Sequence, residues 1–452
     1  MAKSPVCLTR ITTSSLPALI RAFKDNKTKD LTVADKAMRF STLNAQDGTK
    51  TSLSSSVARG GNGKIRYGLD DQDHLSAIKV IHLLGAVKDP SRSPRIEIKK
   101  PVAPMPSFPL PHISKEIAIQ NAVSDLPITH LWLVGRDIYV EMPAMRIDLF
   151  EIMADPKAFT QAIPDLNDRH RVINALMLQI VRGLKKCHDK NVAVLDLKLE
   201  NLMLDSEGVA HLIDFGGAVE VDASKKAYGP QGTPEYMPEE LLNRYADFQH
   251  AMNERKPYVD EIGYDGMAAD IWELGWVLCM LSPEAMTAFM KLTEAEQNSL
   301  SMLYLEWFKK PDGPKYAHIG AFFDTLHRVD PALHDMVHTR MLTPKASDRA
   351  GIAELETWLL QRQPAADNIK EQTACAHAWG QWQQFVNHHP KAKEQDAVKE
   401  KLHAYRLGCL ASPEPHKHHE HAISGAWIAL GVSAAVLVGA FMARQGPRAF
   451  LR

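Results

Sequence analysis

The spacing of apolar and polar residues divides the chain into a β-rich part and a helical part. Between residues 53 and 142, short apolar runs are interrupted by turns rich in glycine and proline, which is typical of strands. Between residues 143 and 361, Leu, Met and Ile recur at helical spacing, for example in residues 172–187 and 270–281. The pattern predicts an α+β, bilobal fold in which a small β-rich N-lobe precedes a larger α-helical C-lobe.

Three segments do not follow this pattern. Residues 1–52 are rich in Ser, Thr and Lys and are interpreted as a flexible leader. The alternative for residues 1–30 is a non-cleaved export or organelle-targeting signal. Residues 90–111 contain seven prolines, which excludes a central strand or helix and predicts an extended insertion in the N-lobe. Residues 362–421 are polar and charged without a long apolar stripe, so we expect a linker or stalk.

Residues 422–443 form an uncharged run near the C-terminus. As a helix this run would be about 33 Å long, which is enough to cross a hydrocarbon core of about 30 Å. We expect one transmembrane helix, followed by a basic tip at residues 444–452, with the large domain in the cytosol. The alternative is a buried helix docked on the soluble domain. Gly431, Ala435 and Gly439 recur at every fourth position, and such a stripe would let two helices pack as a homodimer.

Charge and cysteine content narrow the functional classes. The 53 Lys and Arg residues are balanced by 54 Asp and Glu residues, which argues against a nucleic-acid binder. The five cysteines are scattered without a Cys-x-x-Cys pair, so neither a disulfide scaffold nor a zinc ribbon is expected. The soluble part is therefore expected in a reducing compartment.

Four polar residues carry the candidate chemistry. Asp196, Lys198 and Asn201 follow a long helical pattern, and Asp214 begins an Asp-Phe-Gly sequence thirteen residues after Asn201. Carboxylate and carboxamide oxygens suit Mg²⁺, so Asn201 and Asp214 are predicted to hold metal ions against phosphate groups. Asp196 is expected to take or orient the proton of an acceptor hydroxyl. Lys198 is expected to neutralise charge on the transferred phosphoryl group.

In this order and at this spacing, the motifs resemble the eukaryotic-like protein kinase family over residues 53–361. The resemblance implies that ATP and Mg²⁺ are the cofactors and that a protein is the substrate. It also implies that a glycine-rich loop covers the nucleotide through Gly60, Gly61, Gly63 and Ile65.

Other parts of the nucleotide site are implied by the same resemblance. Ala77 and Lys79 lie in a segment that resembles the strand with the phosphate-binding lysine, and Glu116 resembles the helix glutamate that pairs with this lysine. Glu141 and Pro143 lie in a segment that resembles the interlobe hinge, whose backbone would hydrogen-bond adenine.

The resemblance continues into the C-lobe. Residues 232–239 resemble the end of the activation segment, with one residue missing before Pro238. Residues 270–275 resemble the buried helix that anchors the catalytic loop. Arg349 resembles the late arginine of the family and is expected to pair with Glu239.

Departures from the family pattern concern catalysis and regulation. Val194 and Leu195 stand where the family has His and Arg, and Ala58 replaces the first glycine of the loop. Without that arginine, a phosphate on the activation segment would lack its partner, so we expect regulation by membrane clustering or by a binding partner.

Three functions remain compatible with the sequence. The motif Asp196-x-Lys198 with Thr233 resembles the Ser/Thr-directed branch, which favours a membrane-anchored Ser/Thr protein kinase. A catalytically impaired pseudokinase scaffold at a membrane is the first alternative. A small-molecule phosphotransferase is the second, although it would not share the activation-segment motif or Arg349.

Overall fold

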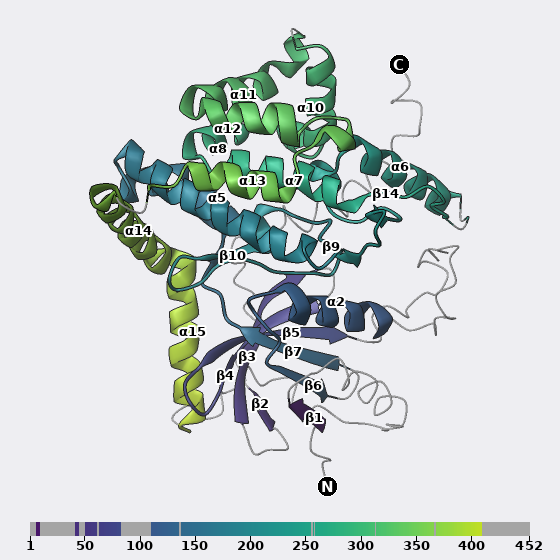
Figure 1. Ribbon diagram of the computed structural model, residues 1–452. Helices are drawn as coiled ribbons and strands as arrows, with labels where there is room; N and C mark the ends of the chain where they lie inside the picture. Colours follow the sequence, from purple (N-terminus) through teal and green to yellow (C-terminus); the bar gives the residue numbers. More distant parts are fainter. Residues whose placement is uncertain are drawn as a thin grey trace.

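The computed structural model describes residues 6–9, 41–44, 50–60, 63–82, 110–134, 137–254, 256, 258–311, 313–365 and 368–408. These residues form two lobes, with a sheet in one and mostly helices in the other (Figure 1). Gly61, the proline-rich segment up to residue 109 and the apolar segment 422–443 lie outside the described residues.

The N-lobe contains an antiparallel sheet with strand order β1-β6-β7-β5-β4-β3-β2. Its strands are β1 (Val6–Thr9), β2 (Ser41–Asn44), β3 (Lys50–Gly60), β4 (Gly63–Leu69), β5 (Leu75–His82), β6 (His130–Val134) and β7 (Asp137–Pro143). The β-rich N-lobe predicted from apolar runs is thus present, and its central strand is β5.

Two of these strands come from the segment expected to be a flexible leader. Val6 pairs with Leu133 at one edge of the sheet, and Ser41 pairs with Leu53 at the other edge. Backbone hydrogen bonds to strands further along the chain fix both segments, a contact that local composition does not reveal. The prediction of a flexible leader therefore does not hold for residues 6–9 and 41–44.

Helix α2 (Leu110–Val123) lies between the N-lobe sheet and the C-lobe (Figure 1). Ile117 and Ile119 are buried on it. Gln120 is also buried, and its Nε2 donates a hydrogen bond to the carbonyl oxygen of Leu126 at 3.1 Å. This polar side chain is therefore accommodated without leaving its amide nitrogen unpaired.

The C-lobe is mostly helical, as the periodicity predicts. Its helices before residue 362 are α3 (Leu149–Met153), α4 (Pro156–Ala162), α5 (Leu166–His188), α6 (Glu239–Asn253), α7 (Gly266–Met280), α8 (Pro283–Phe289), α9 (Glu294–Gln297), α10 (Leu300–Lys309), α11 (Ala317–Val329), α12 (Pro331–Met336) and α13 (Ile352–Gln361). Its short strands are β8 (Ile147–Asp148), β9 (Val192–Ala193), β10 (Leu202–Leu204), β11 (Ala210–Leu212), β12 (Val219–Glu220), β13 (Lys226–Ala227) and β14 (Tyr264–Asp265). Short helical turns are η2 (Leu199–Asn201), η3 (Pro234–Tyr236), η4 (Pro314–Tyr316), η5 (Val337–Met341) and η6 (Ala346–Asp348).

Helix α7 forms the centre of this lobe, and all but one of its residues are buried. Asp265 caps its first turn by accepting a hydrogen bond from the backbone of Ala268 at 2.9 Å. The indole nitrogens of Trp272 and Trp276 both donate to Ser301 Oγ, at 3.1 and 3.2 Å. The buried helix therefore brings its polar groups to partners inside the core, as burial requires.

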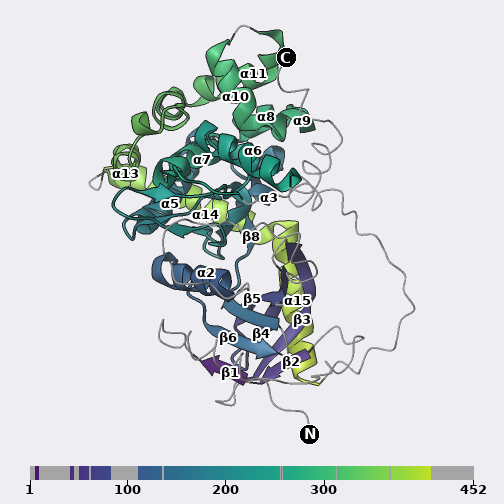
Figure 2. The ribbon, with the colours of Figure 1, turned by 90° about the vertical axis from the view of Figure 1, so that its right-hand side faces the viewer.

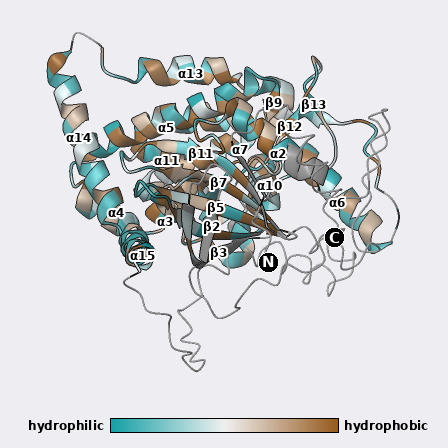
Figure 3. Ribbon diagram, turned by 90° about the horizontal axis from the view of Figure 1, so that it is seen from below, coloured by the Kyte–Doolittle hydropathy of each residue, from teal (hydrophilic) through white to brown (hydrophobic). Residues whose placement is uncertain are grey.

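The region expected to be a polar linker instead contains two packed helices, α14 (Ile369–His388) and α15 (Pro390–Arg406). α14 lies against the C-lobe, and α15 runs beside β3 and β4 of the N-lobe (Figures 1 and 2). Hydrophobic and hydrophilic residues are mixed along α14 in Figure 3, so its few buried positions are not obvious in the sequence. The linker interpretation therefore fails for residues 368–408, because a few large side chains suffice for packing.

None of the helices within the described ranges is long and apolar enough to cross a membrane.

Candidate active site

A lysine of the N-lobe contacts two carboxylates from different elements. β5 carries Lys79, whose Nζ lies 2.6 Å from Glu116 Oε1 on α2 and 3.3 Å from Asp214 Oδ1. Burial alone lowers the pKa of the Lys79 ammonium, but the Asp214 and Glu116 carboxylates outweigh burial and raise this pKa above its ordinary value. Lys79 is therefore a fixed positive charge at the boundary of the two lobes.

The two predicted metal ligands lie at the same end of a short hairpin. β10 pairs with β11 through Leu202 and Leu212, and the backbone N–H of Ile213 donates to the carbonyl oxygen of Asn201 at 2.9 Å. Asp214, which follows directly, has φ of 59°, and this left-handed backbone turns the chain after the strand.

The carboxamide of Asn201 is oriented by Asp196. Its Nδ2 donates to the backbone oxygen of Asp196 at 2.8 Å and to Oδ2 of the same residue at 3.1 Å. These contacts use the nitrogen and leave Oδ1 as the atom that can ligate a cation. Asn201 Oδ1 and the partly exposed Asp214 carboxylate are hard oxygen ligands, so the residues present fit Mg²⁺.

Asp196, Lys198 and Thr233 form a compact polar group. Thr233 Oγ1 donates to Asp196 Oδ1 at 2.6 Å, and Lys198 Nζ lies 2.7 Å from Thr233 Oγ1 and 3.1 Å from Asp196 Oδ2. Burial lowers the pKa of Lys198, but the carboxylates of Asp196 and Glu200 outweigh burial and raise it. A hydroxyl group therefore already occupies a position between a carboxylate and an ammonium group.

Asp270 holds the backbone of the segment before Asp196. Its carboxylate is fully buried and accepts hydrogen bonds from the backbone of Val194 at 2.9 Å and of Leu195 at 2.7 Å. His188 Nε2 lies 2.8 Å from its Oδ2. These bonds stabilise Leu195 at φ of 60°, an unusual conformation for a branched side chain.

Glu273 and Gly232 also lie against this loop. Glu273 Oε2 accepts a hydrogen bond from the backbone of Leu197 at 2.7 Å, and burial raises the pKa of Glu273 well above its usual range. Gly232 has φ of +98°, and a Cβ there would lie 2.2 Å from the carbonyl oxygen of Leu195. Only glycine therefore allows the activation segment to approach the loop this closely.

Leu195 has no contact with solvent. It belongs to an apolar cluster with Ala193, Met237, Leu241 and other residues around it. Leu195 is therefore a buried hydrocarbon side chain directly before Asp196.

The glycine-rich segment forms a hairpin at the end of the N-lobe sheet. Gly60 pairs with Gly63 where β3 turns into β4, and Gly61 lies outside the described residues. Ile65 pairs with Lys79 across β4 and β5, and Ala77 pairs with Tyr67. Because opposite residues of paired strands share a face, Ile65 and Ala77 lie on the Lys79 face of the sheet.

Glu141 does not lie on that face. Its Oε1 accepts a hydrogen bond from Ser76 Oγ at 2.6 Å, and its carbonyl oxygen accepts one from the backbone of Thr129 at 2.8 Å. The register of β5 and β7 instead pairs Ala77 with Met142, and Pro143 pairs with Ser76 at the end of the ladder. The side chain of Glu141 therefore lies on the face opposite to Lys79, because strand register sets the face of each residue. The backbone contact of Glu141 and Pro143 with adenine stays a prediction.

Arg349 pairs with a different glutamate from the one expected. Its Nη1 lies 2.6 Å from Glu240 Oε1 and its Nη2 lies 3.0 Å from Glu240 Oε2. Glu239 instead contacts Lys309 at 3.2 Å on the surface. When Glu240 is taken as the glutamate that pairs with the arginine, residues 232–240 match the family pattern without a missing residue. The gap expected before Pro238 is therefore wrong.

Gln395 and Arg146 form a polar contact that the sequence does not predict. Gln395 is buried, and its Nε2 donates to the carbonyl oxygen of Met145 at 2.6 Å, two residues after β7. Arg146 Nη1 donates to Gln395 Oε1 at 2.9 Å. Nothing in the local sequence marks Gln395, because its role depends on how α15 packs.

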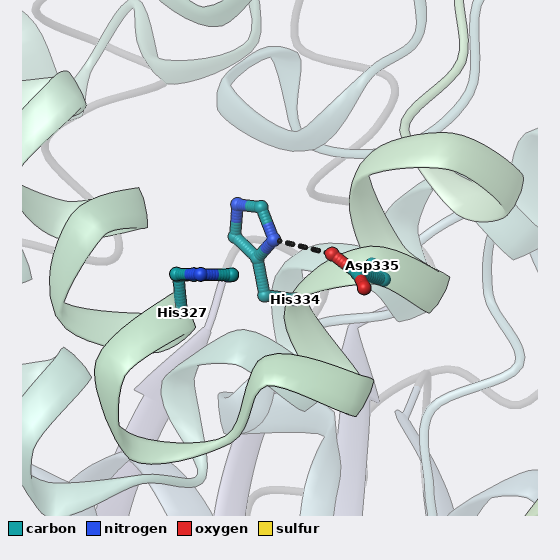
Figure 4. A group of neighbouring side chains, drawn as sticks. All are labelled: His327, His334 and Asp335. Atoms are coloured by element: carbon teal, nitrogen blue, oxygen red, sulfur yellow. Dashed lines mark hydrogen bonds and ion pairs between the residues drawn. The ribbon is translucent and has the colours of Figure 1, made fainter.

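Another group of candidate metal ligands lies in the C-lobe. His327, His334 and Asp335 have ligand atoms within 4.8 Å of one another (Figure 4). His334 Nδ1 is hydrogen-bonded to Asp335 Oδ1 at 3.1 Å, and His327 and Asp335 are exposed. α11 and α12, which carry these residues, lie at the end of the C-lobe remote from the N-lobe sheet (Figure 1). The group therefore has no part in the site around Lys79.

The site thus combines a lysine held by two carboxylates, two oxygen ligands suited to Mg²⁺, and a carboxylate beside a hydroxyl group. These are the groups that a phosphotransferase site requires. Residues 53–358 match the protein kinase domain family. This match covers more than half of the chain, and the chain belongs to that family.

Related proteins carry kinase names. CBL-interacting serine/threonine-protein kinase 13 of Arabidopsis thaliana is 30% identical over 177 residues, which are 38% of this chain and 30% of the relative. Serine/threonine-protein kinase 17A of Oryctolagus cuniculus is 26% identical over 332 residues, which are 69% of this chain and 73% of the relative. The chain therefore spans less than a third of the first of these relatives and nearly three quarters of the second.

Proposed function

We propose that this chain is an active Ser/Thr protein kinase that transfers the γ-phosphoryl group of ATP to protein hydroxyls. The observation that carries the proposal is the contact of Lys79 with both Glu116 and Asp214. Three distant segments, in β5, in α2 and after β11, thereby bring their charges together where the two lobes meet. One fixed cation beside a free carboxylate oxygen is what a metal-bound triphosphate requires.

Each residue of this site has a role in the proposal. Bound Mg-ATP supplies the phosphoryl group and the cations that offset its charge. Lys79 would contact the phosphates, and Asn201 and Asp214 would hold the metal ions. Asp196 would accept or orient the proton of the acceptor hydroxyl, and Lys198 would offset charge on the transferred group.

The Ser/Thr preference is supported by two features. The relatives are named as serine/threonine-protein kinases. Thr233 Oγ1 lies 2.6 Å from Asp196 Oδ1 and 2.7 Å from Lys198 Nζ, so the loop already accommodates an aliphatic hydroxyl.

Regulation would not depend on a phosphate at the activation segment. Leu195 is buried and apolar, so it offers no charge-assisted bond to such a phosphate. The residues that could accept a phosphate are Ser224, Tyr228 and Thr233. Alanine at Ser224 or Tyr228, which lie outside the group around Asp196, is expected to leave the rate of transfer within about twofold, because the loop is already held by Asp270. A strong dependence of activity on these hydroxyls would contradict this part of the proposal.

Transfer of radiolabelled phosphate from ATP to a generic protein substrate tests the activity. Lys79→Met and Asp214→Ala should each lower the rate by at least about a hundredfold, because each removes a charge that faces the phosphates. Lys185→Met is the matched control, since Lys185 pairs with Asp189 on the surface of α5. If the wild type and both cleft variants give the same background, the chain is a pseudokinase scaffold and not an enzyme.

We also propose that residues 422–443 anchor the chain in a membrane with the kinase domain in the cytosol. The support is their length without charge, which suffices for one span. Truncation after residue 421 should move the protein from the membrane fraction to the soluble fraction, and protease added outside sealed vesicles should reveal the orientation. Unchanged membrane association after truncation would contradict the anchor.

The stripe of small residues Gly431, Ala435 and Gly439 would let two such helices pack as a dimer. Leucine at Gly431 and Gly439 should then weaken chemical cross-linking of two copies of the chain.

A further inference from the structure

Helices α14 and α15 connect the two lobes outside the matched kinase domain. The family match ends at residue 358, whereas α14 begins at residue 369 and α15 ends at residue 406. α15 extends from the level of the interlobe connection along the N-lobe sheet (Figure 2).

α14 is fixed to the C-lobe. Trp382 is fully buried, its Nε1 donates to the carbonyl oxygen of Gly208 at 2.9 Å, and its ring centroid lies 5.4 Å from that of Phe159. Asn387 Nδ2 donates to the carbonyl oxygen of Ser206 at 2.8 Å. A buried tryptophan with a satisfied indole N–H is a strong packing anchor.

α15 is fixed to the N-lobe. Arg406 Nη2 and His403 Nδ1 lie 2.6 and 2.8 Å from Asp73 Oδ1, in the turn between β4 and β5. Arg406 Nη1 also donates to the carbonyl oxygen of Asp70. The end of α15 therefore moves with the sheet that carries Lys79.

The hinge between the lobes consists of residues 141–148, from the end of β7 to the start of α3, and both helices contact it. Both polar atoms of the Gln395 side chain are hydrogen-bonded to the hinge. Nε2 donates to the carbonyl oxygen of Met145 at 2.6 Å, and Oε1 accepts a hydrogen bond from Arg146 Nη1 at 2.9 Å. Arg146 also contacts both oxygens of Asp396, at 2.6 and 3.0 Å, and donates from Nε to Asn387 Oδ1 at 3.2 Å.

We propose that α14 and α15 form an interlobe brace, and that Gln395 is a positioning residue that holds the hinge in the conformation used for nucleotide binding. The inference rests on the proposed kinase function. Gln395 is only 3% exposed, and burying its amide costs free energy unless both polar atoms are paired. An apolar residue would pack α15 without this cost, so the chemistry of Gln395 is directed at the hinge.

Two variants of the full chain separate the hinge bond from packing. Gln395→Ala removes both bonds, whereas Gln395→Glu keeps an acceptor for Arg146 but places no donor against Met145 O. Both should raise the KM for ATP and the Kd for Mg-ADP by about five- to tenfold, which corresponds to roughly 1 to 1.4 kcal/mol, while kcat changes less than KM. Gln384→Ala is the matched control, because it removes an exposed glutamine from α14.

Hydrogen exchange provides a readout that does not require transfer activity. In both Gln395 variants, amides of residues 137–148 should exchange faster than in the wild type and in the Gln384→Ala control. Unchanged nucleotide affinity with unchanged hinge exchange would overturn the brace, even if the melting temperature fell. Tighter nucleotide binding in the variants would overturn it as well, because the helices would then be inhibitory.

These outcomes are distinct from those of the proposed function. A wild type that binds Mg-ADP but transfers no phosphate would remove the kinase activity and leave the hinge result standing. A wild type that binds no nucleotide would leave the exchange rates of the hinge to decide whether the brace exists.

Discussion

Glu239 and Glu240 are neighbours with the same side chain, but they contribute differently to the stability of the fold. Glu239 and Glu240 both lie in the first turn of α6, where a negative charge is favoured by the helix dipole. Glu239 pairs with the exposed Lys309, whereas Glu240 neutralises the guanidinium of Arg349, whose side chain is fully buried. The guanidinium carbon of Arg349 also lies 5.1 Å from the ring centroid of Trp272. The choice of partner therefore decides which glutamate stabilises the fold.

Glu240→Ala should lower the free energy of unfolding by about 3–5 kcal/mol, because it leaves a buried cation without its partner. Glu239→Ala should lower it by less than about 1 kcal/mol, because its partner is exposed to solvent. Urea unfolding of the two variants and the wild type measures the difference. Equal losses, or a larger loss for Glu239→Ala, would contradict the assigned pair.

Asp148 makes the stability depend on pH. Burial raises the pKa of this N-cap carboxyl from 3.8 to about 6, despite the hydrogen bond that it accepts from the backbone of Glu151 at 2.8 Å. The folded state therefore binds a proton more tightly than the unfolded state between about pH 4 and 6. The stability contributed by this proton is fully present below pH 4 and is lost as the pH rises through 6.

Asp148→Asn should gain stability over the wild type by roughly 2 kcal/mol as the pH rises from 4 to 7, because the amide caps the helix without ionising. Denaturant unfolding at a series of pH values measures this difference. Asp155→Asn changes the exposed N-cap of α4 and controls for the loss of a charge at a cap. A constant difference between Asp148→Asn and the wild type across this range would contradict the prediction.

At the scale of elements, α14 depends on few side chains. Ala378, Trp382 and Val386 are fully buried, and they recur every fourth residue along one side of the helix. Trp379 is less buried, although its Nε1 also donates to a carbonyl oxygen of the β10–β11 turn, that of Glu207, at 3.2 Å. The helix therefore offers two tryptophans with similar hydrogen bonds and different burial.

Trp382→Ala should lower the free energy of unfolding by about 3–5 kcal/mol, since it leaves a large cavity beside Phe159. Trp379→Ala should cost about 1 kcal/mol, in line with one lost hydrogen bond at a partly exposed site. Thermal and urea unfolding of the two variants distinguish these values. A small effect of Trp382→Ala would show that α14 is not anchored as described.

At the scale of the whole molecule, the folded unit extends past the matched kinase domain. Charged contacts at the end of α15 and the buried Trp382 of α14 tie the last described residues to both lobes. Their loss would expose the hinge and the apolar surface under α14 to water.

A chain that ends at Gln361 should melt roughly 10 °C below a chain that ends at Gly408, because several kcal/mol of packing are removed. It should also be cut faster by protease between residues 137 and 148. The comparison needs thermal unfolding and limited proteolysis of the two chains side by side. Identical melting temperatures would mean that α14 and α15 add nothing to the folded unit.

Short-range spacing was sufficient for the parts of the site that lie on one element or in one loop. Asp196, Lys198 and Asn201 lie within six residues, so their common position follows from the local chain. The resemblance to the kinase family predicts that Lys79 pairs with Glu116, and the structure places Lys79 Nζ 2.6 Å from Glu116 Oε1. The alternation of strands and the spacing of apolar helix positions also determined the two lobes, because both reflect a fixed geometry of backbone and side chain.

Only the tertiary structure decided which face of β7 meets the cleft, which glutamate meets Arg349 and what α14 and α15 contact. The register of β5 and β7 pairs Glu141 with Ile78, which places its side chain on the face opposite to Lys79, and composition does not reveal this register. Likewise, Gln395 reaches the hinge across 250 residues of sequence, a distance that only packing can close. Local sequence sets the conformation of a segment, but the burial of its side chains depends on segments far along the chain.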